Sequence, residues 1–192
     1  MSTVAPLTTF NFRVLISGEV QENKLIEADD VLATAGILAQ GVPAAAAAAG
    51  ADTIRAGFSE VSGLNSEIDM EDYREGGRNI GPRRFPRWGR YPNLVLRRGV
   101  TSDAALWKWW ADVITRSYTR QFPGNRPLPR RNGLILLEGF DHKAVAAWFF
   151  ANALPERLSG PGLNARSNEI AIETLELSHE GLLRLNNVPP GV

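Results

Sequence analysis

The sequence has no cysteine and only two histidines among its 192 residues. The missing thiols exclude disulfides, cysteine nucleophiles and zinc sites built on thiolates. His142 and His179 do not form the H-x-x-x-H spacing of a metalloprotease helix, and we interpret them as a turn residue and a strand residue. The G-K-[S/T] phosphate loop and the G-x-S-x-G nucleophile turn are absent as well. We therefore expect no enzymatic activity, no cofactor and no metal site.

Long apolar runs are also missing. No stretch approaches the roughly 20 apolar residues that a membrane helix needs. The first ten residues, MSTVAPLTTF, lack the basic start and apolar core of a secretory signal. Lys plus Arg and Asp plus Glu both number 21, a balance unlike that of a general polyanion binder. We expect a soluble cytoplasmic protein that forms a single domain over residues 1–192 and does not insert into a membrane.

Alternation of apolar and polar residues predicts a mainly β fold with about seven strands. The clearest strand covers residues 10–18, FNFRVLISG, and ends at Gly18. A hairpin is predicted from residues 134–137 and 145–154, and one long closing strand from 169–185. In the closing strand the apolar phase flips between Ile172 and Leu175, which requires a bulge, a bend or a change of sheet.

One helix is predicted over about residues 102–117. Thr101 or Ser102 can cap it, and Asp103 then lies in its first turn, where the helix dipole favours an acid. Trp107 lies outside the apolar stripe, at the surface or at an interface. The stripe itself follows the spacing of one buried helix face and comprises Leu106, Trp109, Trp110, Val113 and Ile114.

Residues 19–57 interrupt the strand pattern between the first two predicted strands. They contain one short helical pattern and an alanine run from Ala44 to Ala49. Alanine favours helix but buries little surface. We expect an alanine-rich, partly helical insert in this position.

Residues 72–100 hold eight arginines. Glycine and proline break this stretch as far as Pro92, which predicts a loop, and NLVLRRGV from Asn93 to Val100 then resumes as a strand. Just before this stretch, Ile68 and Met70 share one face of a predicted strand, and acids line the other. Those acids require water or cations beside them. Three partners are open for the arginines: a nucleic acid, acids elsewhere in the fold, or another copy of the chain.

Several short motifs follow one another in a fixed order along the chain. They are FNFRVLISG, FSEVSGL, DYREGG, NLVLRRGVT leading into LWKWW, RRNGLILL, SGPGLNA and NEIAIETLELSHEGL. This succession, over residues 10–18 and 58–183, resembles the tail tube protein family of contractile-tailed phages and contractile injection systems. The resemblance implies an Hcp-like β-barrel of two packed antiparallel sheets with one flanking helix. It also implies no catalytic residue and no cofactor.

The same resemblance implies a structural function. Homohexameric rings would stack into a hollow tube inside a contractile sheath, and the tube would be driven through a target envelope. The implied partners are the sheath protein, baseplate or spike proteins, tube-initiator proteins and a cargo effector in the lumen. Assembly would occur in the bacterial cytoplasm, and the particle would then be cytoplasmic, membrane-anchored, extracellular or a virion tail. The family joins its first two strands by a short turn, so the insert at 19–57 is a departure, placed on the outside or at a ring contact.

On this interpretation the arginine segment contacts another copy, in the same ring or in the next. Acids of one copy, including Glu169, Glu173, Glu176 and Glu180, would face arginines of the next in a head-to-tail stack. The alternative is a nucleic-acid-binding β-barrel that uses the Arg-rich loop 74–98, with steep salt dependence; the neutral balance makes specific nucleic-acid binding the weaker interpretation. The candidate interface residues are Arg74, Glu75, Arg78, Arg83, Arg84, Arg87, Arg90, Glu67, Asp69 and Glu71.

Overall fold

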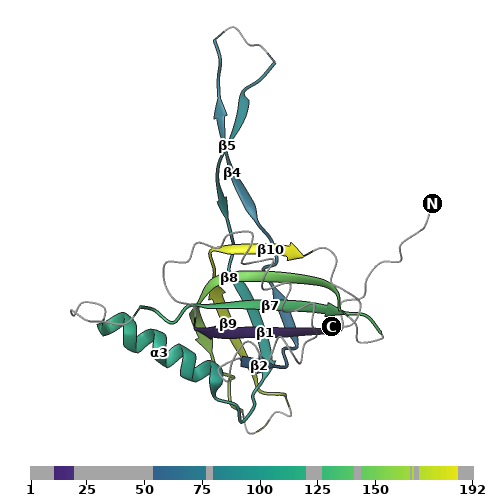
Figure 1. Ribbon diagram of the computed structural model, residues 1–192, viewed down its shortest axis with the longest axis vertical. Coiled ribbons are helices and arrows are strands. Elements are labelled where there is room, and N and C mark those ends of the chain that lie inside the picture. Colours follow the sequence, from purple (N-terminus) through teal and green to yellow (C-terminus); the bar gives the residue numbers. More distant parts are fainter. Residues whose placement is uncertain are drawn as a thin grey trace.

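The computed structural model shows a β-rich body from which one long hairpin projects (Figure 1). It describes residues 11–19, 54–76, 80–119, 127–140, 144–164, 166 and 169–185. Within these residues there are ten strands and one helix. The mainly β class with a single flanking helix is therefore confirmed, although the sequence had predicted fewer strands.

The elements follow one another along the chain in this order. They are β1 (Phe12–Glu19), β2 (Ile54–Ala56), β3 (Glu60–Ser62), β4 (Glu67–Tyr73), β5 (Arg83–Arg90), β6 (Leu94–Gly99), α3 (Ala105–Thr119), β7 (Arg131–Glu138), β8 (Ala144–Ser159), β9 (Ile172–Ser178) and β10 (Gly181–Leu185).

Strand β8 joins the two layers of the body. The hydrogen-bonded order is β2-β1-β7-β8-β9-β6-β3, and β10 pairs with β8 outside this path. Residues 147–151 of β8 pair with β10, whereas residues 154–159 pair with β9. All pairings are antiparallel. A single strand of 16 residues thus passes from one sheet into the other.

Asn152 lies at the point where β8 changes sheets. Its φ of 52° is in the left-handed region, which asparagine tolerates better than most residues. Its backbone N–H donates to Oδ1 of Asn132 at 2.9 Å, and its Nδ2 donates to Oε2 of Glu180 at 2.9 Å. These hydrogen bonds hold the strand at its corner, because they satisfy polar groups that the interrupted ladder leaves without strand partners.

The main core lies between the two layers. Val14, Ile16 and Phe150 enter it from one sheet, and Leu96 and Leu175 enter it from the other. Phe150 packs so closely over Gly133 that a Cβ there would lie 2.1 Å from the ring. Glycine at this strand position is therefore a packing requirement. A smaller cluster of buried apolar side chains lies on the other face of β7 and β8, so both faces of these strands are apolar.

Helix α3 begins at Ala105, later than the predicted residue 102. Asp103 precedes the helix and caps it, since its Oδ1 accepts the N–H of Ala105 at 2.9 Å. Leu106 and Trp109 are buried against the core, and Trp110 and Val113 are partly buried. The buried indole of Trp109 donates to the carbonyl of Pro129 at 2.7 Å.

Three sequence predictions are corrected by the structure. The arginine segment is not a loop throughout, because residues 83–90 form β5. The long closing strand is divided into β9 and β10, and the phase flip arises because Ile172 at the start of β9 is exposed. Residues 54–56, placed in the insert, form β2 beside β1. The insert from 20 to 53, with its predicted helix, lies outside the described residues.

Candidate assembly site: the β4–β5 hairpin

The strands β4 and β5 form a two-stranded antiparallel sheet that projects from one end of the body (Figure 1). Among the described strands, they pair only with each other. Every residue of β5 is exposed, and so are all residues of β4 except Asp69. The predicted strand around Ile68 and Met70 and the predicted loop after it thus form the two strands of a solvent-surrounded arm.

A bulge explains how glycine and proline fit into this arm. Ile68 lies opposite Gly89 and Met70 opposite Pro86, so Asp69 faces two residues of β5. Bulges and edge strands are the places where a sheet tolerates proline. Pro86 and Gly89, which predicted a loop, therefore lie in a bulged edge strand.

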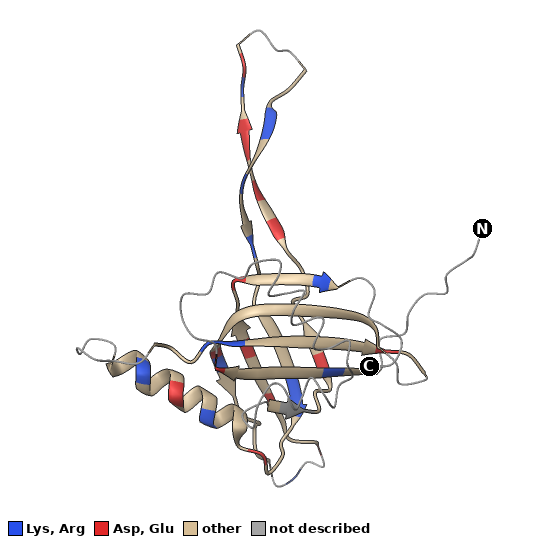
Figure 2. Ribbon diagram, viewed as in Figure 1, with Lys and Arg blue, Asp and Glu red and all other residues tan. Residues whose placement is uncertain are grey.

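The charges of the arm form ion pairs between its two strands, and Figure 2 shows acidic and basic segments along the arm. The side chains of all partners are between 40% and 70% exposed. The pairs are Arg83–Glu75 at 3.1 Å, Arg84–Asp72 at 3.2 Å, Arg87–Glu71 at 3.5 Å and Arg90–Asp69 at 3.9 Å. Opposite charges on neighbouring strands stabilise a hairpin, and exposed pairs each contribute less than about 1 kcal/mol.

This arrangement answers the question of what the arginines face. Arg83, Arg84, Arg87 and Arg90 pair with acids of the same hairpin, the second of the three partners left open by the sequence. Arg74 and Glu67 of the candidate set make no ion pair with another described residue, and Arg78 lies outside the described part. That these residues contact another copy remains a prediction. The nucleic-acid alternative loses its main support, because most of its arginines already have acidic neighbours.

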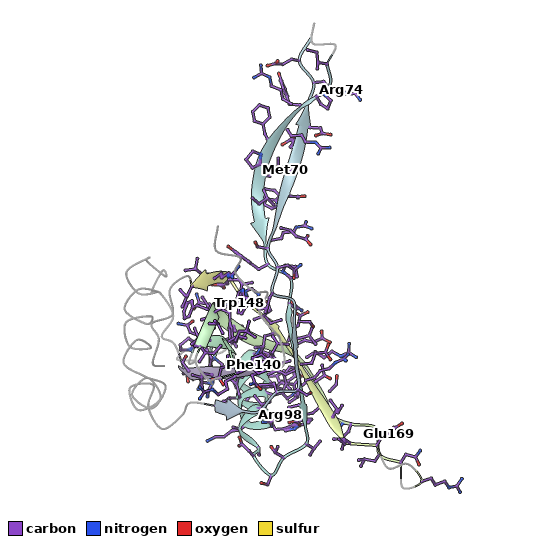
Figure 3. All side chains as sticks on the ribbon, turned by 90° about the vertical axis from the view of Figure 1, so that its right-hand side faces the viewer. Met70, Arg74, Arg98, Phe140, Trp148 and Glu169 are labelled. Atoms are coloured by element: carbon purple, nitrogen blue, oxygen red, sulfur yellow. The ribbon has the colours of Figure 1, made fainter. Side chains whose placement is uncertain are left out.

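Large apolar side chains project from the same arm. Figure 3 shows side chains extending from both strands around Met70, well away from the body. They lie on both faces of the hairpin, since Tyr73 and Phe85 share the face opposite Met70. Exposed apolar side chains in such number on a projecting element are typical of an interaction surface. With their exposed fractions, they are Ile68 (63%), Met70 (49%), Tyr73 (57%), Phe85 (48%) and Trp88 (56%).

Two ring contacts order these side chains. Tyr73 and Phe85 meet edge to face with their centroids 6.2 Å apart. The guanidinium of Arg87 lies 4.6 Å from the ring centre of Trp88. Aromatic and cation–π contacts of this kind hold exposed rings in defined positions. The arm therefore presents a partly ordered apolar surface.

The body, unlike the arm, buries an ion pair that the sequence did not predict. Arg98 and Glu173 are almost fully buried and form an ion pair. The second oxygen of Glu173 accepts the indole N–H of Trp107 at 3.0 Å, and Nη2 of Arg98 donates to the carbonyl of Asp103 at 3.1 Å. The pair thereby fastens the start of α3 to β6 and β9.

A sequence signal for this pair did exist. Arg98 continues the alternation of the buried Leu94 and Leu96, and Glu173 shares the phase of Leu175 and Leu177. Both charges therefore stood at interior positions of two strands. Because Arg98 was grouped with the exposed arginines of residues 72–100, its pairing with Glu173 was not predicted.

Two of the other acids near the C-terminal end of the chain, Glu176 and Glu180, form ion pairs with arginines of the body. Glu180 pairs with Arg130 at 2.8 Å, and Glu176 pairs with Arg157 at 3.7 Å. Neither acid faces an arginine of the hairpin in the same chain. On α3, Arg116 donates to both oxygens of Glu19 at 2.5 and 3.0 Å, and these hydrogen bonds raise the pKa of Arg116.

Chemistry-bearing groups are sparse over the described ranges. There, no group of three or more histidine, aspartate or glutamate residues is arranged to hold a metal ion. His179 is buried, and its two ring nitrogens contact the carbonyls of Gly181 at 3.0 Å and Pro92 at 3.1 Å. In the same part of the chain, no helix is long and apolar enough to cross a membrane.

Chains with this fold occur in solved structures of a baseplate, a sheath–tube complex and a tube cap. One chain of the anti-feeding prophage (AFP) baseplate shares 22% identity and a TM-score of 0.68, with 95% of this chain and 97% of that chain covered. A chain of the PVC sheath–tube complex of an extracellular contractile injection system, in its extended state, shares 20% identity and a TM-score of 0.63, with 95% and 93% covered. At these identities the likeness establishes the fold.

A chain of the AFP tube-terminating cap has the same fold, with 20% identity, a TM-score of 0.64, and 97% of this chain and 95% of that chain covered. No curated protein matches the chain in sequence. The family model of the T4-like virus tail tube protein gp19, however, matches residues 8–183, which is nearly the whole chain. The protein therefore belongs to the tail tube family of T4-like viruses, and the resemblance seen in its motifs is confirmed.

Proposed function

We propose that this tail tube protein forms hexameric rings that stack into a hollow tube inside a contractile sheath. The tube is driven through a target envelope when the sheath contracts, and cargo passes through its lumen. Family membership supports a structural role in such a tube. Chains of the same fold occur in a baseplate, a sheath–tube complex and a tube cap, which supports baseplate and sheath proteins as partners.

The projecting hairpin is the observation that carries this proposal. An isolated two-stranded sheet is only marginally stable in water. This one keeps large apolar side chains exposed on both strands, and within the described residues it packs on no second layer. A partner that covers the arm would stabilise the two-stranded sheet and would remove its apolar side chains from water.

Another copy of the chain is the partner that fits best. A subunit that offers an arm at one end and receives an arm elsewhere makes a head-to-tail contact, and such contacts build rings or open filaments. The candidate interface residues of the hairpin thus serve subunit assembly. The tube assembles in the bacterial cytoplasm. The finished particle is then cytoplasmic, membrane-anchored or extracellular, or it is the tail of a virion.

Negative-stain microscopy of the purified protein tests this function. We expect rings with sixfold symmetry and tubes with an axial hole. A variant in which a short glycine–serine turn replaces residues 67–90 should keep the circular dichroism of the body but form neither. A full-length chain that stays monomeric at every concentration, alone and with a sheath protein of a contractile injection system, would contradict the proposal.

A further inference from the structure

His179 lies where the arm joins the body. Strand β5 ends at Arg90 and β6 begins at Leu94, so Pro92 lies in the short connection that leads from the arm into the body. His179 lies between the end of β9 and the start of β10, and Figure 1 shows β10 at the end of the body from which the arm rises. Its ring contacts the carbonyl of Pro92 and thereby joins this connection to the β9–β10 turn.

Both nitrogens of this buried ring face hydrogen-bond acceptors. Nε2 lies 3.1 Å from the carbonyl oxygen of Pro92, and Nδ1 lies 3.0 Å from the carbonyl oxygen of Gly181. A carbonyl oxygen can only accept a hydrogen bond, and a neutral imidazole has only one N–H to donate. The neutral ring therefore satisfies one of the two carbonyls, whereas the doubly protonated imidazolium satisfies both.

Loss of the second proton breaks the link between the two carbonyls. The nitrogen that loses its proton turns a lone pair toward a carbonyl oxygen, and two acceptors at hydrogen-bond distance repel each other. Either tautomer of the neutral ring keeps only one contact, with Pro92 or with Gly181. The complete link, from Pro92 through His179 to Gly181, therefore requires the charged ring. We call this connection the His179 link.

The other titratable groups near the ring have contacts of their own. In the connection after β5, the ring of Tyr91 packs on His179 with the centroids 5.6 Å apart. In the β9–β10 turn, Glu180 is paired with an arginine of the body at 2.8 Å. On β8, Glu156 accepts a hydrogen bond from Asn93 at 2.8 Å. No carboxylate of the described residues forms an ion pair with the histidine, so the two carbonyls are what distinguish its charged from its neutral form.

The β4 side of the arm is attached to the body without any titratable group. Gly63, which follows β3, has a φ of 88°, and a Cβ there would lie 2.1 Å from the carbonyl oxygen of Asn93. Only glycine allows this close backbone approach. The next residue, Leu64, packs against the main core. A proton on His179 therefore acts on one side of the attachment, the connection after β5.

We infer that the His179 link is a proton-dependent switch that fixes the direction of the arm relative to the body. The closed link binds one more proton than the open link, so lowering the pH favours the closed form. Histidine ordinarily changes its charge between about pH 5 and pH 8, which is the range in which such a switch acts. The switch operates within one chain. Where the arm binds a partner, as the proposed function requires, an arm already held in one direction loses less conformational entropy.

Distances between two spin labels test the switch directly, because the chain has no native cysteine. Met70→Cys places one label on the arm and Val145→Cys places the other on β8, both at exposed positions. The doubly labelled chain is diluted into an excess of unlabelled full-length chain, so that only distances within one chain are measured. We expect a narrow distance distribution at about pH 5.5 and a broader one at about pH 8.5, on either side of the ordinary histidine pKa of about 6.5.

Two matched variants assign the response to one of the two histidines of the chain. His179→Gln removes the titratable ring, and its distance distribution should have the same width at both pH values. His142→Gln removes the other histidine and should narrow at acid pH as the unmodified chain does. Carboxylates ordinarily titrate near about pH 4, outside the range that is compared. Circular dichroism shows whether both variants are folded.

NMR of the unmodified chain supplies a readout that needs no variant to fold. At about pH 5.5 the carbonyl carbons of Pro92 and Gly181 should both have the chemical shifts of hydrogen-bonded carbonyls, and at about pH 8.5 one of the two signals should move. Two unchanged carbonyl signals would overturn the switch. A distance distribution whose width does not depend on pH, or a response that persists in His179→Gln, would overturn it as well. If the arm responds as expected but no rings or tubes form, the switch stands and the proposed function fails.

Discussion

The body and the hairpin arrange the same kinds of residues in opposite ways. In the body, apolar side chains fill the core and the ion pair of Arg98 and Glu173 is buried with them. In the hairpin, apolar side chains and ion pairs alike are exposed. The body is thus complete as a folded unit, whereas the hairpin is not.

This difference indicates how folding and assembly are divided within one chain. Hydrophobic stabilisation of the fold is concentrated where water is already excluded. The apolar surface of the arm contributes little to the isolated chain and is available for a partner. Changes in the body should therefore affect unfolding, and changes in the arm should affect assembly.

The largest contrast is expected from tryptophan truncation in the two regions. Trp109→Ala removes a buried ring and its hydrogen bond, and should lower the free energy of unfolding by about 3–5 kcal/mol. Trp88→Ala removes an exposed ring and should change it by less than about 0.5 kcal/mol. Urea denaturation of both variants measures this. Trp88→Ala should instead raise the concentration needed for assembly, and a similar loss of stability in both variants would remove the contrast.

Ion pairs give the next contrast, at two adjacent positions of β6. Arg98→Met leaves Glu173 buried without its cation and should lower the free energy of unfolding by about 3 kcal/mol or more. Arg97→Met breaks the exposed pair with Glu60 and should cost less than about 1 kcal/mol. Thermal unfolding compares the two. Adding Glu173→Leu to Arg98→Met should recover much of the loss, since no unpaired charge then remains inside.

The body was largely predictable because its residues alternate in phase with burial. Val14 and Ile16 in β1 and Leu94 and Leu96 in β6 follow that rule, whereas β7 and β8 were recognisable from their nearly continuous apolar runs. The helix was evident from its apolar spacing. Its start was misplaced because Asp103, and not Thr101 or Ser102, accepts the first backbone N–H.

In the arm, β4 was predicted as a strand from the alternation around Ile68 and Met70, whereas β5 was not. Every residue of β5 is exposed, so it shows no apolar period, and Pro86 and Gly89 indicate a loop. Between β9 and β10, His179 contacts the carbonyls of Gly181 and Pro92. The contact with Pro92 joins residues far apart in the sequence, so no local pattern predicts it.

The smallest effect on stability is expected from charge reversal within the arm. Arg83→Glu with Arg84→Glu breaks two exposed pairs and should change the free energy of unfolding by less than about 1 kcal/mol. Assembly should be impaired, because like charges then face each other along the hairpin and distort it. Sedimentation and negative-stain microscopy measure the loss of tubes.

Reversing the partners as well decides which role the arginines have. Glu75→Arg with Asp72→Arg, added to the reversed arginines, rebuilds both pairs in the opposite sense within the arm. If the charges act inside the hairpin, this fourfold variant should assemble nearly as the unmodified chain does. If they act between copies, each reversed residue would meet an unchanged charge on its neighbour, and assembly would remain impaired. Recovery of tubes therefore supports an arm that is stabilised by its own ion pairs and binds its partner through apolar side chains. Continued loss of tubes would indicate that the arginines form ion pairs between subunits.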